Sequence, residues 1–163
     1  MSGSYSSPPC YASEVAPDYF GAITAMTCSE LLLLLRRLAA AERAGASAAA
    51  TFMNDHEPDS AVRKQFAALQ RCELKNCATL TQLIMRLGGN DSRSSERIVD
   101  NAPALRESRA QIEFLSHGQG RLAGFIHDAL PTIEQGFVRH ALTEMEDSHL
   151  FNVEACEALV ETL

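Results

Sequence analysis

The chain has 163 residues, of which 46% are hydrophobic and 21% are charged. That balance is typical of one globular domain and unlike a disordered, collagen-like or membrane-embedded chain. Its 21 acidic and 14 basic residues give a net charge of −7 and a pI near 5.2, the wrong sign for tracking a phosphate backbone. The apolar run 31–35 is too short to cross a bilayer. We therefore expect no nucleic-acid partner, no membrane span and no targeting segment.

The cysteines are odd in number and form no Cys-x-x-Cys pair. This pattern indicates reduced, partly buried thiols in a cytoplasmic protein rather than a disulfide framework. Cys72 and Cys77 are five residues apart, a poor helical spacing for binding one ligand together, so we interpret both as packing residues.

Residues 1–26 are rich in serine, proline and tyrosine and follow neither a helical nor a strand period. They predict an extended N-terminal arm, and 27–163 predict a helical bundle. The bundle begins at Thr27-x-x-Glu30, a capping box in front of a leucine-rich helix that continues to Phe52. A second helix is expected from its N-cap Asp59 to the Gly88-Gly89 stop.

The segment 88–103 shows no periodicity. Its sixteen residues can extend to about 50 Å, whereas a 22-residue helix is about 33 Å long, so the segment is long enough to cross a bundle from end to end. A third helix then carries an apolar stripe from Leu105 to Ile126, and Pro131 is expected in the first turn of a fourth helix that reaches Leu159. No run of alternating β-branched residues indicates a strand.

Four helices joined by two short turns and one long crossover predict an all-α fold, the ferritin-like variant of the four-helix bundle. An up-down bundle with a flexible second connection is the alternative.

Each helix interrupts its apolar stripe with polar residues near its middle. An ionisable group at such a position is costly unless it is paired, protonated or bound to a metal. If the first two helices are antiparallel, Glu42 lies level with residue 76 and within one turn of Glu73. The spacing Glu146-x-x-His149 places both side chains on one face of the fourth helix. The remaining interruptions are Asn76 and Gln119.

These residues resemble the ferritin-like di-iron proteins, in which two helices each supply a Glu and two supply Glu-x-x-His. The chain departs from that pattern at Asn76, where a His is expected, and at Gln119, where an acid is expected. The resemblance therefore implies a single-ion site at Glu42, Glu73, Glu146 and His149, with Asn76 and Gln119 as polar neighbours. Three carboxylates and one imidazole suit iron, manganese or zinc.

Short motifs spread along nearly the whole chain also resemble a bacterial ferritin-like family of unknown function. They are Ala41-Glu42-Arg43-Ala44-Gly45, Gly118-Gln119, Ala129-Leu130-Pro131 and Leu142-x-x-Met145-x-x-x-His149-x-x-Asn152-Val153. The resemblance implies a polar cluster in the middle of the bundle but no particular reaction.

Each of these candidate residues also has an ordinary structural interpretation. Glu42 and Glu73 can be buried acids held by hydrogen bonds, His149 a core histidine, and Glu146 a solvated surface acid. Glycines at 118, 120 and 124 in the third helix indicate either tight packing inside the bundle or room for a ligand or partner helix. That glycine-rich face and the aromatic arm lead us to expect a homodimer, the commonest closed oligomer.

Three functions remain open at this point, and catalytic residues are not identified. The first is a metal-binding protein, with iron or manganese reacting with oxygen or peroxide. The second is a degenerate, metal-free bundle that acts as a binding or assembly module. The third is a hydrolase or lyase that uses the two acids and His149 for acid–base chemistry on an unknown small molecule.

Overall fold

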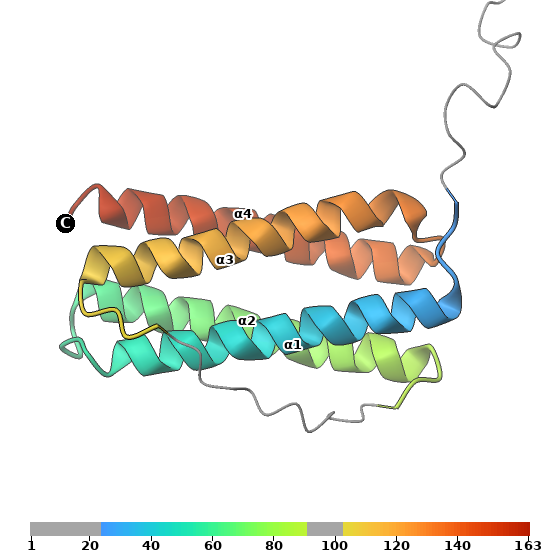
Figure 1. Ribbon diagram of the computed structural model, residues 1–163, viewed down its shortest axis with the longest axis horizontal. Helices are drawn as coiled ribbons and strands as arrows, with labels where there is room; N and C mark the ends of the chain where they lie inside the picture. Colours follow the sequence, from blue (N-terminus) through green and yellow to red (C-terminus); the bar gives the residue numbers. More distant parts are fainter. Residues whose placement is uncertain (1–23, 91–102) are drawn as a thin grey trace, which may run out of the picture.

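The computed structural model describes residues 24–90 and 103–163, and these two segments contain helices and no strand. The helices are α1 (Cys28–Met53), α2 (Ala61–Arg86), α3 (Ser108–Ala129) and α4 (Gly136–Val160), with a 3₁₀ turn, η2 (Leu130–Thr132), between the last two. The four helices lie side by side as a bundle (Figure 1). The predicted all-α class is confirmed, whereas most of the predicted arm lies outside the described residues.

The capping box at the start of α1 is present as predicted. Thr27 Oγ1 accepts a hydrogen bond from the Glu30 backbone N–H at 3.3 Å, and the Glu30 carboxylate accepts the Thr27 backbone N–H at 2.8 Å. This reciprocal pair satisfies two backbone donors that a helix start would otherwise leave open.

Three boundary predictions were wrong by a few residues. Ser60, not Asp59, caps α2, because its hydroxyl accepts the Arg63 backbone N–H. Leu105 lies before α3, which begins at Ser108. Pro131 belongs to η2 and not to the first turn of α4, because the Thr132 carbonyl is held there by the Met26 backbone N–H at 2.8 Å.

The order of the helices in space matches the predicted crossover. Arg36 near the start of α1 bonds to Asn90 beyond the end of α2, at 3.4 Å. At the other end, Gln111 at the start of α3 bonds to Asp55 in the α1–α2 turn. The end of α2 and the start of α3 therefore lie at opposite ends of the bundle (Figure 1). The up-down alternative does not have this arrangement.

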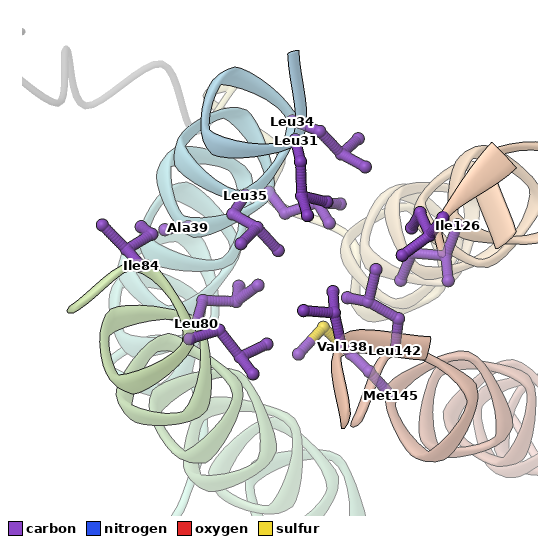
Figure 2. Close-up of a cluster of buried hydrophobic side chains, with 13 residues drawn as sticks. Leu31, Leu34, Leu35, Ala39, Leu80, Ile84, Ile126, Val138, Leu142 and Met145 are labelled. Carbon is purple, nitrogen blue, oxygen red and sulfur yellow. The ribbon is translucent and has the colours of Figure 1, made fainter. Parts of the chain in front are cut away.

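The buried apolar residues form two clusters with a polar layer between them. One cluster contains leucine, isoleucine and valine side chains from all four helices, and Figure 2 shows Leu80 facing Val138 and Met145 across the bundle. The other gathers Phe52, Phe66 and their neighbours near the α1–α2 turn. Burial of this kind stabilises by about 25 cal/mol for each Å² removed from water.

Gln111 attaches the start of α3 to the α1–α2 turn. Its side chain is fully buried, its amide nitrogen donates to Asp55 Oδ2 and to the Leu105 carbonyl at 2.8 Å each, and its oxygen lies 2.6 Å from His56 Nε2. The contacts join segments on both sides of the crossover, so they help to fix where α3 begins.

We expect Gln111→Ala to lower the free energy of unfolding by about 1–3 kcal/mol, because it leaves buried polar partners unpaired. Thermal unfolding should show a midpoint several degrees lower. The matched control is Gln65→Ala, since Gln65 makes only a 3.7 Å contact to Cys156 Sγ. Equal effects of the two substitutions would contradict this role for Gln111.

Candidate metal centre

Between the two apolar clusters lies a buried polar network drawn from all four helices. All but one of its residues interrupt the apolar stripes where the sequence predicts, and each is at most 7% exposed. We call this set the central network: Glu42, Glu73, Asn76, Gln119, His149 and Asn152. Hydrogen bonds connect every member to at least one other member.

His149 on α4 lies at the centre of the network. Its Nε2 is 2.8 Å from Glu42 Oε1 on α1, and its Nδ1 is 2.7 Å from Gln119 Oε1 on α3. The Gln119 oxygen also accepts from the Asn152 amide at 2.9 Å. An oxygen can only accept here, so Nδ1 carries a proton and donates it to Gln119. The other ring nitrogen, Nε2, therefore faces the Glu42 carboxylate.

The two carboxyl groups each have one oxygen held by an amide. Asn76 on α2 donates to Glu42 Oε2 at 3.2 Å, and Gln119 donates to Glu73 Oε1 at 2.6 Å. The two groups differ in their second oxygen. Glu42 Oε1 faces His149, whereas Glu73 Oε2 is buried without a hydrogen-bond partner in the structure.

Burial raises the pKa of the Glu73 carboxyl to about 8, with the nearby Glu42 charge adding to the rise and the Gln119 hydrogen bond opposing it. A buried acid next to a second acid is expected to hold its proton in this way. Because Oε1 accepts from Gln119, the proton belongs on Oε2. At neutral pH and without a bound cation, Glu73 is therefore neutral.

Glu146, the fourth predicted ligand, lies apart from this network. Its Oε1 is 2.9 Å from Nδ1 of His127 on α3, and its side chain is partly exposed. The contact with His127 shows that Glu146 lies on the α3 side of α4 and not in the bundle centre, although the three-residue spacing predicts one helix face for Glu146 and His149. The structure thus brings together Glu42, Glu73 and His149 of the four predicted ligands.

Asn152 is a member of the network that the sequence reasoning did not select. It lies three residues after His149, a spacing that puts both on one helix face, so the same rule could have identified it. Its amide also donates to Cys72 Sγ at 3.4 Å, and that thiol lies 2.9 Å from Ser148 Oγ. Cys72 and Ser148 are only partly buried, so this contact leads from the network toward the surface.

The Cys77 thiol near the network remains protonated. Burial, followed by the Glu42 charge, raises the pKa of the Cys77 thiol to about 11. A thiolate is the form of cysteine that binds metals or attacks electrophiles, so Cys77 is not prepared for either. The cysteines within the described segments are free of disulfides.

No group of three or more His, Cys, Asp or Glu side chains in residues 24–90 and 103–163 is already arranged to hold a metal ion. Except for Glu73 Oε2, the atoms of the network that could bind a metal are instead joined by hydrogen bonds. No helix in these segments is long and apolar enough to cross a membrane.

A family model described as a domain of unknown function, DUF6306, matches residues 29–158. This range takes in nearly all of the four helices, and the chain belongs to that family. No curated protein and no solved structure matches the chain.

We expect Glu73→Gln to reduce the pH dependence of stability in metal-free protein. The folded-state pKa of about 8 lies above the ordinary value of 4.5, so the stability that the proton contributes is complete below the unfolded pKa and is lost as pH rises through the folded pKa. The thermal midpoint of the unsubstituted chain should therefore decrease as the pH is raised from about 5 to about 9. The midpoint of the variant, which mimics the neutral acid, should decrease less. Identical slopes in chelator-treated samples would refute the assignment.

Proposed function

We propose that this member of the DUF6306 family is a ferritin-like metal-binding protein whose bundle centre holds one transition-metal ion through Glu42, Glu73 and His149. One observation carries the proposal. Amide side chains hold one atom of each of these three groups and leave the other atom for a cation. The atoms left over are Glu42 Oε1, Glu73 Oε2 and His149 Nε2.

The spacing of two of these atoms supports the proposal. Glu42 Oε1 and His149 Nε2 are 2.8 Å apart, close to the separation of two neighbouring ligand atoms that each lie about 2.0–2.2 Å from one ion. Glu73 Oε2 is a buried carboxyl oxygen without a partner. Metal binding would draw Glu73 toward the other two groups and release the protons that they carry.

The amides have the role that supporting side chains have in known metal sites. A histidine ligand usually donates its second ring N–H to a fixed acceptor, and Gln119 accepts the Nδ1–H of His149 in this way. Asn76 fixes the orientation of the Glu42 carboxylate. Both residues were expected as polar neighbours of the ligands, and they would hold the site in shape rather than bind the ion.

Two carboxylates and one imidazole suit iron or manganese, and zinc also accepts this donor set. When bound, iron or manganese would supply one-electron chemistry with oxygen or peroxide, which would make the protein an oxidoreductase. Glu42 and His149 are fully buried, so any reactant must be small. The proposal includes a cytoplasmic location, which is favoured by the odd number of cysteines and the lack of a Cys-x-x-Cys pair in the sequence.

We expect the protein, loaded anaerobically with ferrous iron and then desalted, to retain about one ion per chain, as measured by elemental analysis. Glu42→Gln and Glu73→Gln should each lose most of the iron, because the substitutions keep the side-chain size and remove the charge. His149→Ala should lose it as well. Exposure to air should then change the visible absorption of the iron-loaded unsubstituted protein and not that of the variants that have lost the iron.

Glu146→Gln is the matched control, since it makes the same chemical change outside the central network. It should retain the iron. Loss of iron in this variant would restore Glu146 to the ligand set. If the unsubstituted protein retains no metal after loading with iron, manganese or zinc in turn, the proposal is refuted.

The alternative is a metal-free assembly module, and one surface favours it. Phe114 and Phe125 on α3 are 38% and 45% exposed, and an added Cβ at Gly118, which shares their helix face, would meet no atom within 4 Å. Tight packing inside the bundle therefore does not explain Gly118. A glycine between two exposed rings would let a second copy of the chain approach closely.

We expect light scattering to show a dimer at micromolar concentration and Phe125→Glu to convert it to a monomer, because the charge would be buried in the interface. Leu163→Glu, at an exposed apolar residue of the C-terminal end, should leave the dimer intact. A monomeric unsubstituted chain would exclude the assembly through α3.

A further inference from the structure

We infer that Gly45 on α1 is a positioning residue, which keeps open the space that the Glu73 carboxyl group occupies. An ideal Cβ built at Gly45 would lie 2.6 Å from Glu73 Cδ and 2.7 Å from Oε2, and closer still to Oε1. Real Cβ atoms essentially never approach other heavy atoms within 3.0 Å. An alanine at 45 and the present position of the Glu73 carboxyl are therefore incompatible.

Helix propensity makes glycine an unexpected residue at this position. Gly45 lies in the interior of α1, where glycine is less favourable than alanine, and alanine is used repeatedly in the surrounding helix. The need to accommodate the carboxyl of a neighbouring helix accounts for the exception. The glycine does not serve a backbone turn, because its φ is not positive.

The consequence of an added methyl group follows from what can move. The carboxyl is the far end of a flexible side chain, so it would give way before the backbone of α1 does. Displacement would break the 2.6 Å hydrogen bond from Gln119 to Glu73 Oε1 and shift Oε2, the atom without a partner. Gly45 thus sets where the carboxyl group of Glu73, the third proposed metal ligand, lies in the central network.

The metal-binding part of this inference rests on the proposed function, whereas the positioning part does not. Ferrous iron is the probe for the first part, and thermal unfolding of iron-free protein is the measurement for the second. Gly124→Ala is the matched control for both, because nothing lies within 4 Å of an added Cβ there.

We expect Gly45→Ala to bind ferrous iron at least about tenfold more weakly, while Gly124→Ala binds it like the unsubstituted chain. The double variant Gly45→Ala with Glu73→Asp should recover affinity relative to Gly45→Ala alone, because aspartate is one methylene shorter. Iron binding by Gly45→Ala equal to that of the unsubstituted chain, or no recovery in the double variant, would overturn the metal-binding part.

In iron-free protein, Gly124→Ala should raise the thermal midpoint by about 2–4 °C through helix propensity alone. Gly45→Ala should lower it. In a Glu73→Ala background the space is empty, so Gly45→Ala should raise the midpoint as Gly124→Ala does. This reversal of sign supports positioning even if the unsubstituted chain binds no iron, a result that would refute only the proposed function. A rise in both backgrounds would overturn the inference.

Discussion

Two carboxyl groups and an imidazole are buried in the middle of the four-helix bundle. Charged groups in such a place cost several kcal/mol unless they are paired or neutralised. The structure meets the cost in two ways. Glu42 and His149 face one another at 2.8 Å, and Glu73 holds a proton because burial raises its pKa to about 8. Gln119 and the asparagines then supply donors and acceptors for most of what remains.

This network also joins the two halves of the bundle. α1 pairs with α2 and α3 pairs with α4, and each pair is a hairpin (Figure 1). The bond from Glu42 to His149 connects α1 with α4, and the bond from Gln119 to Glu73 connects α3 with α2. Apolar clusters tolerate some sliding of one helix along another, but a shift of one turn, about 5.4 Å, would break both bonds. Polar residues of this kind are therefore expected to fix the register of the helices in addition to holding any ligand.

Much of this arrangement could be predicted from the sequence, because a polar residue that interrupts an apolar helical stripe must face the core. That rule found Glu42, Glu73, Gln119 and His149, and the length of the second connection predicted the crossover. Glu146 shows the limit of the rule. It lies beside the stripe rather than in it, and the structure gives it His127 as a partner. The reason for Gly45 could not be found in its own helix, since the atoms that require a glycine belong to α2.

A proton and a metal ion are alternative ways of neutralising the same buried groups. Burial favours the first for Glu73, whose buried oxygen without a hydrogen-bond partner is the one available to hold the proton. A cation that entered would have to displace the Glu73 proton. Its apparent affinity would therefore rise with pH until Glu73 is already deprotonated in the metal-free protein. The same burial that makes the acids expensive as charges makes them strong ligands, because no water competes for their oxygens. A bundle that keeps this set without a metal must therefore keep the Glu73 proton, and the space at Gly45 accommodates the carboxyl in either state.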